Sequence, residues 1–397
     1  MTDFAATKAQ FPLPPGVIYL DGNSLGPLPR GAIAAAERVI RDEWGGMLIR
    51  AWNQAGWMEQ PRRVGDQIAQ LIGAAPGTVV AGDTLSIKVF QALSAGLALR
   101  PGRRFVLSDS GNFPTDLYIA DGLLRMLDRG LELKIVAPEA VHDALDDSVA
   151  VMMLTHVDYR TGRLHDMHGL TQRAHAAGAV ALWDLAHSAG AVPLDVAGAR
   201  ADFAVGCTYK YLNGGPGAPA FIYARPDHAE TIHPALAGWL GHAAPFAFEP
   251  DYRPGAGIDR LRVGTPAVVQ MTILQAALEI WSDIDLHDLR ARSIELSELF
   301  IREVEARCPA LRLASPRDPA QRGSQVSFGF DHGYAAMQAL IAHGLIGDFR
   351  APDLMRFGIT PLYLDETDIH AAAAIIERTL ATEAWSRPEF QRRAAVT

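Results

Sequence analysis

The middle of the chain alternates short apolar runs with amphipathic stretches of helical period. The apolar runs are continuous and bounded by turn residues, so they predict buried strands at 78–81, 104–108, 133–136, 149–155, 179–184, 201–207 and 218–223. The amphipathic stretches between them predict helices, including those at 84–99, 115–128 and 166–177. Continuous apolar strands separated by helices predict a mostly parallel sheet that is covered on both faces.

The two ends of the chain follow a different pattern. Residues 30–44 have the period of an amphipathic helix with no strand after it, and residues 267–307 form a long helical stretch. Shorter patterns then predict a strand at 325–330 and helices at 335–342 and 368–380.

This change of pattern predicts an α/β fold with two domains. We place a large domain at about 50–265, and a smaller α+β domain built from residues 1–49 and 266–397. In an open α/β sheet a ligand binds outside the carboxyl ends of the parallel strands, so we expect the site there.

Polar residues follow two of the predicted strands at their carboxyl ends. One strand ends at Asp184 and continues to His187, and another continues through Thr-Tyr to Lys210 and then Asn-Gly-Gly-Pro-Gly. A lysine amine can hold the aldehyde of pyridoxal 5'-phosphate (PLP), and a carboxylate can keep its pyridine nitrogen protonated, so that the ring accepts electrons. An Asp alone at a strand end is usually a helix cap, and a lone loop lysine is usually solvated. Their order, and the Gly-rich segment after the lysine, favour a PLP enzyme.

A phosphate cradle is predicted between the first strand and the next helix. The segment Gly82-Asp-Thr-Leu-Ser86 combines hydroxyl groups with the N-terminus of a helix. Backbone N–H groups at such an end bind phosphate.

Several segments resemble kynureninase, a family of type I PLP enzymes. They are Tyr19–Gly26 (YLDGNSLG), Asn112–Asp116 (NFPTD), Trp183–Gly190 (WDLAHSAG), Cys207–Gly217 (CTYKYLNGGPG) and Arg356–Tyr363 (RFGITPLY). The Asp…His and Tyr-Lys pieces are shared with other type I PLP enzymes, whereas FPTD and YKYLNGGPG are more particular to kynureninase. The resemblance covers nearly the whole chain and implies the type I PLP-enzyme fold.

The resemblance also implies a role for each matched residue. Lys210 would form the Schiff base, Asp184 would pair with the pyridinium nitrogen, and Phe113 would stack on the ring. The implied catalytic residues are Lys210, Tyr209 and Asp184. The implied cofactor-binding residues are Leu85 (by its backbone), Ser86, Phe113, Pro114, Thr115, Asp116, Thr155, Asp184, His187, Tyr209, Lys210, Trp239 and Thr265, the last reaching the phosphate from the other subunit of a homodimer.

The implied reaction is the hydrolysis of L-kynurenine to anthranilate and L-alanine. Lys210 would remove the α-proton as general base, and Tyr209 would move protons at the carbonyl. Arg356 would hold the substrate carboxylate as a bidentate pair. Trp52 and Gly264 match positions that line the substrate ring, which favours kynurenine over 3-hydroxykynurenine. An alternative is that Trp52 is a core or interface aromatic.

The amino-acid composition limits the kinds of partner that we expect this protein to bind. The formal net charge of -9 argues against nucleic acid, because binding its backbone needs clustered Lys and Arg. Only two cysteines, Cys207 and Cys308, occur, and the N-terminus has no pattern of a signal peptide. We expect a soluble cytoplasmic protein with no membrane partner. The resemblance to kynureninase implies a homodimer whose active sites lie at the interface.

Two motifs suggest other chemistry but lack the context for it, and two other classes of protein stand beside kynureninase. Gly22-Asn-Ser-Leu-Gly26 matches the nucleophile elbow of α/β-hydrolases, but no strand deep in a sheet precedes it and prolines follow, so we interpret it as a turn near the active site. His165 and His168 have no further ligands at matching spacing, so no metal site is predicted. Another type I PLP enzyme, such as a cysteine desulfurase or an aminotransferase, is the main alternative to kynureninase. A non-enzymatic binding module is the third possible function.

Overall fold

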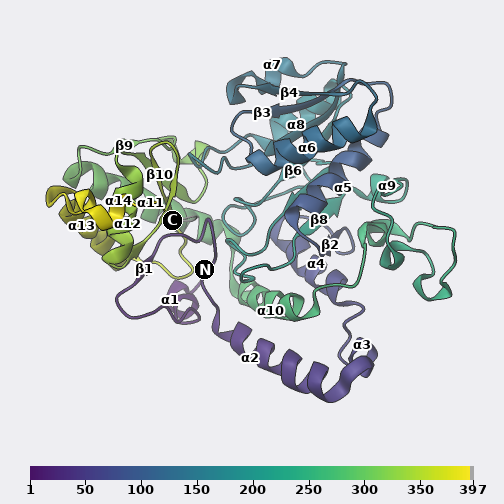
Figure 1. The fold of residues 1–397 in the computed structure, drawn as a ribbon, viewed down its shortest axis with the longest axis horizontal. Helices are drawn as coiled ribbons and strands as arrows, with labels where there is room; N and C mark the ends of the chain where they lie inside the picture. Colours follow the sequence, from purple (N-terminus) through teal and green to yellow (C-terminus); the bar gives the residue numbers. More distant parts are fainter. Residues whose placement is uncertain (394–397) are drawn as a thin grey trace.

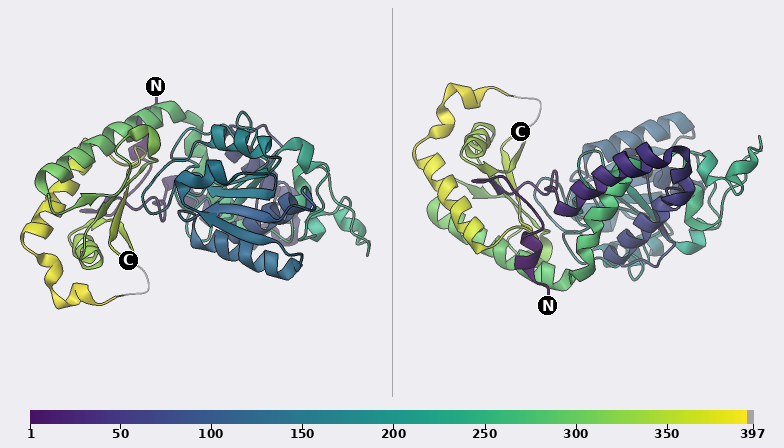
Figure 2. Two further views of the ribbon diagram at one scale, coloured as in Figure 1. Left: turned by 90° about the horizontal axis from the view of Figure 1, so that it is seen from above. Right: turned by 90° about the horizontal axis from the view of Figure 1, so that it is seen from below.

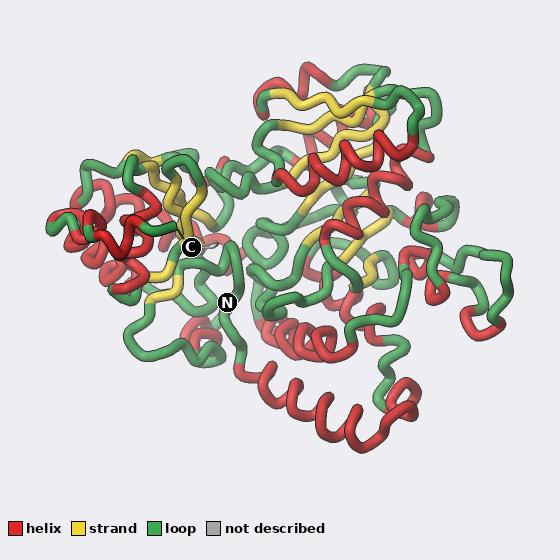
Figure 3. The backbone as a smooth tube through the Cα atoms, in the orientation of Figure 1, coloured by secondary structure: helices red, strands yellow, loops and turns green. Residues whose placement is uncertain are grey.

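The computed structural model of the chain describes residues 1–393. Two lobes are visible in each view of Figure 2, and the chain termini both lie on the smaller one. A seven-stranded sheet forms the centre of the larger lobe, and a four-stranded sheet lies in the smaller lobe. The region between the lobes consists mainly of loops, drawn in green in Figure 3.

The large sheet confirms the prediction of a mostly parallel arrangement. Its strands follow the order β2 (Val79–Ala81), β8 (Phe221–Ala224), β7 (Phe203–Gly206), β6 (Val180–Asp184), β5 (Val149–Thr155), β3 (Phe105–Asp109) and β4 (Glu132–Val136). The strands from β7 to β4 are parallel, whereas β8 is antiparallel to both β2 and β7. The carboxyl ends of β6 and β7 therefore lie side by side at one edge of the sheet.

Helices cover both faces of this sheet. One face packs against α5 (Leu85–Ala98) and α6 (Pro114–Leu127). The other packs against α4 (Gln60–Leu71), α8 (Met167–Ala176) and α10 (Val268–Leu278).

The position of β5 between the two helix layers explains why its sequence is apolar throughout. All of its residues are buried, and alternate side chains point to opposite faces. Val151 and Met153 join the core on the α5 side, whereas Met152 and Leu154 join the core on the α8 side. Burial of each such side chain contributes roughly 1.5–3 kcal/mol, which explains why this strand has no polar alternation.

Two predicted helices differ from the observed ones. The helix predicted at 30–44 is α2 (Arg30–Arg38), which continues as a π-helix over Val39–Met47. The helical stretch predicted at 267–307 is divided into α10, a 3-10 turn (Glu279–Asp283) and α11 (Leu286–Arg307). The break is set by Asp285, whose carboxylate accepts hydrogen bonds from the first N–H groups of α11.

The smaller lobe contains an antiparallel sheet and the last long helices. Its sheet has the order β12 (Asp348–Arg350), β13 (Leu354–Gly358), β10 (Gln325–Gly329) and β9 (Arg312–Leu313). A parallel pair, β1 (Ile18–Tyr19) with β11 (Leu345–Ile346), brings the N-terminal segment to this lobe. Its helices include α11, α12 (Gly333–Ala342) and α13 (Glu366–Ala381) (Figure 1).

The remaining helices are short. They are α1 (Phe4–Lys8), α3 (Ala51–Gln54), α7 (Val141–Ala144), α9 (Pro226–Ala229) and α14 (Pro388–Gln391), with 3-10 turns at Leu48–Arg50, Pro138–Ala140, Trp239–Gly241, Pro245–Ala247, Gly257–Leu261, Pro319–Gln321 and Ala384–Ser386. Across residues 1–393, every helix is too short or too polar to cross a membrane. The domain boundaries near residues 50 and 265 stay a prediction; α2 and α10 pack against each other, and α10 also packs against α4 (Figure 1).

Candidate active site at Lys210

Lys210 lies in the loop after β7, and His187 lies in the loop after the neighbouring strand β6. The Lys210 Nζ atom is 2.9 Å from Nε2 of His187. Asp184 is the last residue of β6 and pairs in register with Val205 of β7, so the two strands bring the aspartate to the same edge as the lysine. The predicted meeting of these three residues at the carboxyl ends of parallel strands is observed.

His187 is a neutral imidazole. Burial is the main cause that lowers its pKa well below the usual value, and the charges of Lys210, Arg356 and Arg350 add to it. A neutral imidazole has one acceptor and one donor nitrogen. Nε2 accepts from the Lys210 amine, so Nδ1 carries the proton. This buried Nδ1 has no hydrogen-bond partner among the described residues.

Asp184 and Asp116 form a buried pair of carboxyl groups beside Lys210. Asp184 is 3% exposed and accepts a hydrogen bond of 2.8 Å from the Ala186 N–H. Burial raises the pKa of Asp184 to about 6, although the Lys210 charge opposes that rise. Burial and the neighbouring Asp184 charge raise the pKa of Asp116 well above its usual value. The pair therefore holds a proton on Asp116. A cation beside Asp184 would stabilise its carboxylate and offset the free-energy cost of burying that charge.

Asp116→Asn is expected to stabilise the cofactor-free protein increasingly as pH rises. The folded-state pKa of Asp116 lies above its unfolded value of 3.8, so the native state retains a proton that the unfolded state loses, and stability falls as pH rises from that value towards the folded pKa. Asn cannot ionise, so the loss disappears. We expect the gain in stability to grow steadily from pH 5 to pH 8, which thermal unfolding across this range would measure. A difference from the wild type that stays constant over this range would contradict the shared proton.

Two aromatic rings flank the Lys210 amine. The Nζ atom lies 5.9 Å from the Phe113 ring centroid and 5.8 Å from the Tyr209 ring centroid. Phe113 directly precedes α6, is 38% exposed, and makes an edge contact with Tyr159 at 5.1 Å between centroids. The neighbouring Cys207 and burial raise the pKa of Tyr209 above its usual range, so its phenol keeps its proton and can donate a hydrogen bond.

The segment predicted as a phosphate cradle lies at the N-terminus of α5. Thr84 precedes the helix in extended conformation, and its side chain makes no capping hydrogen bond. The first N–H groups of a helix, here those of Leu85 and Ser86, have no partner within the helix. A cavity of about 240 Å³ is lined by Thr84 together with Gly264 and Thr265.

Lys88 is a residue of this region that the sequence analysis does not identify. Its Nζ atom lies 2.8 Å from Asp83 Oδ2, 3.0 Å from Gln91 Oε1 and 3.3 Å from the Leu261 carbonyl. It is fully buried in α5, and burial lowers its pKa. Lys88 therefore connects the turn before α5 with the segment that leads to Thr265. The only sequence signal is a lysine inside an otherwise apolar helix.

Arg356 on β13 is held by a carboxylate that the sequence analysis also does not identify. Its Nε donates to Asp348 Oδ1 at 2.6 Å, and its Nη2 donates to Asp348 Oδ2 as well. Nη1 donates to the Tyr159 carbonyl, and Nη2 lies 3.0 Å from Ser24 Oγ. Tyr159 contacts Phe113, so the guanidinium adjoins the aromatic wall of the Lys210 site.

Ser24 belongs to the turn that resembles a hydrolase elbow. Gly26 in this turn donates its N–H to the Tyr209 carbonyl at 2.7 Å. A Cβ atom on Gly26 would lie 2.2 Å from the Lys210 carbonyl oxygen, so only glycine allows this approach. The interpretation of the segment as a turn near the active site is confirmed.

Comparison with known proteins identifies the family. Residues 289–376 match the model of the kynureninase C-terminal domain. A kynureninase of Burkholderia pseudomallei (strain 1106a) is 53% identical over 99% of this chain and 96% of its own length. The chain belongs to the kynureninase family. A kynureninase of Pseudomonas fluorescens is 49% identical over the same shares of the two chains.

Solved structures confirm the predicted fold. The cysteine desulfurase CsdA of Escherichia coli has a TM-score of 0.81 at 21% identity, covering 96% of this chain and 99% of its own. A C-DES variant with glycine covalently linked to its PLP cofactor has a TM-score of 0.82 at 19% identity, covering 93% and 99%. At such low identity these structures show the type I PLP-enzyme fold alone, and the family assignment rests on the kynureninases.

Three residues matched to kynureninase positions make other contacts within one chain, although Thr155 lies beside Asp184. Trp52 packs in a small cluster with Trp57, at 5.6 Å between ring centroids, and with Val268 and Val269. Trp239 is 39% exposed and contacts Phe246. Thr155, which pairs in register with Asp184, donates to the Val157 carbonyl at 3.1 Å. The ligand contacts expected of these residues stay predictions.

No metal site is found in the described part of the chain. Residues 1–393 contain no group of three His, Cys, Asp or Glu side chains arranged to hold a metal ion. His165 hydrogen-bonds Asp109 at 2.6 Å, and Asp166 caps α8 by accepting from the Gly169 N–H. His165 thus precedes α8, as expected from the sequence, whereas His168 is the second residue of that helix.

Proposed function

We propose that this chain is a PLP-dependent kynureninase that hydrolyses L-kynurenine to anthranilate and L-alanine by cleaving the Cβ–Cγ bond. One observation carries the proposal: the Lys210 amine contacts His187 at 2.9 Å beside the buried Asp184–Asp116 pair, in a chain 53% identical to a kynureninase. This arrangement supplies both an amine for a carbonyl cofactor and a carboxylate for a cationic ring.

The residues around Lys210 fit PLP. Asp184 would pair with the pyridinium nitrogen, whose charge offsets the burial that raises the pKa of this carboxyl. The buried Nδ1–H of His187 lacks an acceptor among the described residues, and a cofactor oxygen would supply one. Phe113 would cover the ring. The phosphate would be held by Leu85, Ser86, Tyr209 and Trp239, and by Thr265 of a second subunit.

Bound PLP supplies an electron sink for the cleavage of the substrate. Lys210 holds the cofactor, and its released amine removes the substrate α-proton as general base. His187 keeps this amine in place through the 2.9 Å hydrogen bond. Tyr209 keeps its own proton and would transfer protons at the γ-carbonyl, to which water adds.

Arg356 would bind the substrate carboxylate. Asp348 holds the guanidinium by two hydrogen bonds, which fix the orientation of its plane. A carboxylate would approach the Nη1 and Nη2 edge and replace Ser24 or the Tyr159 carbonyl there. Ser24 and Asp348 are therefore positioning residues of the carboxylate site.

The proposal also includes the assembly and the compartment: the protein acts as a homodimer in the cytoplasm. Trp44 on the π-helix is 60% exposed, and Trp239 is 39% exposed, so two large aromatic side chains are available to a second subunit. Cys207 and Cys308 are both free and buried, as is usual in a reducing compartment.

Substrate comparison tests the proposed function. The PLP-saturated protein is incubated with L-kynurenine and, separately, with L-cysteine, and the products are separated by chromatography. We expect anthranilate and L-alanine in equal amounts from kynurenine, and no sulfide from cysteine. Sulfide release without anthranilate would replace the proposal with the desulfurase reading.

We expect the wild type to prefer kynurenine over 3-hydroxykynurenine, and Trp52→His to shift this preference towards the hydroxylated substrate. Trp52 and Val268 pack against the same small cluster, and Val268 is three residues beyond Thr265, so the indole belongs to the region of the segment matched to the aryl pocket. A ring hydroxyl that loses water without gaining a partner costs about 1–3 kcal/mol, or roughly tenfold to a hundredfold in specificity. The ratio of kcat/KM for the two substrates measures it. An unchanged ratio in the variant would make Trp52 a structural aromatic only.

A further inference from the structure

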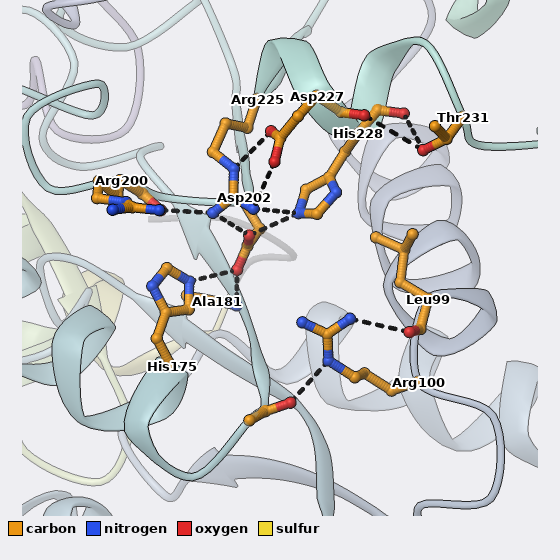
Figure 4. A network of polar contacts seen from close by, with 11 residues as sticks. Leu99, Arg100, His175, Ala181, Arg200, Asp202, Arg225, Asp227, His228 and Thr231 are labelled. Carbon is orange, nitrogen blue, oxygen red and sulfur yellow. Dashed lines mark hydrogen bonds and ion pairs between the residues drawn. The ribbon is translucent and has the colours of Figure 1, made fainter.

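A second pocket lies at the opposite edge of the large sheet from Lys210. Its volume is about 580 Å³, and it adjoins the amino end of β7, where Asp202 precedes the strand. The side chains that line it are mainly basic or amide-bearing: Arg100, His168, Gln172, His175, Arg200 and Arg225. Figure 4 shows several of them gathered around Asp202.

Asp202 is the acidic group at the base of this pocket, and its carboxylate is saturated. Oδ1 lies 2.7 Å from both His228 Nε2 and Arg225 Nη1. Oδ2 accepts from His175 at 2.8 Å and from the Ala181 N–H at 2.7 Å. Burial opposes the charge, but the hydrogen bonds from His175 and His228 outweigh it and hold the pKa of Asp202 well below its usual range. Asp202 thus remains anionic and has no capacity for another cation.

The other carboxylates near the pocket are also engaged. Asp227 forms an ion pair with Arg225 at 2.7 Å. Asp195 accepts from the Gly198 N–H at 2.7 Å, and Asp166 accepts from the Gly169 N–H at 3.0 Å. These two acids cap backbone turns, and among the described residues neither forms an ion pair with an arginine of the pocket.

Arg100 and Arg200 carry the excess positive charge. Within residues 1–393 neither guanidinium forms an ion pair. The Nε and Nη1 atoms of Arg100 donate to the carbonyls of Gly178, at 2.7 Å, and Leu99, at 2.9 Å, and these bonds hold the guanidinium in place. Among the described residues the Arg100 Nη2 atom has no acceptor, and neither does the guanidinium of Arg200. Two unbalanced cations at one pocket are unexpected in a chain of formal charge -9.

We propose that this pocket binds a small dianion, of the phosphate or dicarboxylate type, between Arg100 and Arg200. Guanidinium groups form charge-assisted and often bidentate hydrogen bonds with such oxygens. Gln172 and His168 line the same pocket and add further hydrogen-bond donors. The volume accommodates a phosphorylated or dicarboxylate metabolite, and the site is separate from the PLP site because it lies at the amino ends of the strands.

Anion titration of the holoenzyme tests this site. The protein is saturated with PLP, so its cofactor phosphate site is filled, and ionic strength is held constant with sodium chloride. Inorganic phosphate and malonate are titrated separately by calorimetry, which distinguishes a tetrahedral from a planar ligand. The variants are Arg100→Gln/Arg200→Gln and, as a matched control, Arg129→Gln, which removes an exposed arginine near the start of β4 that does not line the pocket.

We expect one equivalent of at least one of the two anions to bind the wild type and the control equally, and the double variant to bind about tenfold more weakly or not at all. Arg200→Gln alone is expected to weaken binding without changing the melting temperature, because this side chain is exposed and holds no structural contact. The proposal is overturned by a wild type without saturable binding, or by equal weakening in the Arg129 control. Kynurenine turnover does not enter the readout, so failure here leaves the proposed function standing.

Discussion

Lys210→Ala is expected to reduce kcat for kynurenine by about ten thousandfold, because one substitution removes both the attachment point of the cofactor and the general base. The fold should survive. Within residues 1–393 the Lys210 side chain forms a single hydrogen bond, to His187 at 2.9 Å. The measurement is kcat with PLP in excess, with the melting temperature as a check on folding.

Covalent trapping makes this prediction sharper. The sequence contains four lysines, at positions 8, 88, 134 and 210. Borohydride reduction followed by peptide mass analysis should place the cofactor on Lys210 in the wild type and on no lysine in Lys210→Ala. Lys134→Ala is a suitable control, since this lysine lies on β4 away from the site, and it should keep the adduct. An adduct on Lys88 would contradict the assignment, because that residue is the other buried lysine near the cradle.

Asp184→Ala has the second-largest expected effect, a fall in kcat of about 100- to 1000-fold. The carboxylate lies at the base of the site, 3% exposed, and would keep the pyridine nitrogen protonated. Without it the ring accepts electrons poorly. Stability should change little, because the substitution also removes the charge that helps to raise the pKa of Asp116.

Asp184→Asn removes the charge of this side chain while it keeps nearly the same shape. Asn retains the hydrogen bond from the Ala186 N–H, which Asp184 accepts at 2.8 Å, but it cannot balance a pyridinium. We expect both variants to lose turnover to a similar degree while they bind PLP, as measured by visible absorption. Near wild-type kcat in Asp184→Asn with the cofactor bound would contradict the electrostatic role.

The central part of the site can be predicted from sequence because its geometry follows from strand order. Asp184 and Lys210 follow consecutive apolar strands, and consecutive parallel strands place their carboxyl ends together. His187 follows Asp184 in the loop after β6, so the same strand order also explains its 2.9 Å contact with Lys210. The kynureninase-like motifs identify the family, and comparison with known proteins confirms it.

Other features depend on contacts between distant parts of the chain. The pair of Arg356 with Asp348 needs the register of β12 with β13, in which the two residues are partners. The proton held by the Asp116–Asp184 pair requires the first turn of α6 to lie beside the end of β6, and no local sequence pattern indicates that. The division of the predicted 267–307 helix results from one capping aspartate, Asp285, in an otherwise helical sequence.

Isotope labelling of the product tests the central claim, cleavage of kynurenine by water at Lys210, most directly. In H₂¹⁸O the PLP-saturated protein should release anthranilate that carries one solvent oxygen in its carboxylate, because water adds to the γ-carbonyl before the Cβ–Cγ bond breaks. L-Alanine should keep the unlabelled carboxylate of the substrate, and Lys210→Ala should yield neither product. Mass spectrometry that finds no anthranilate, or anthranilate without solvent oxygen, would contradict the account.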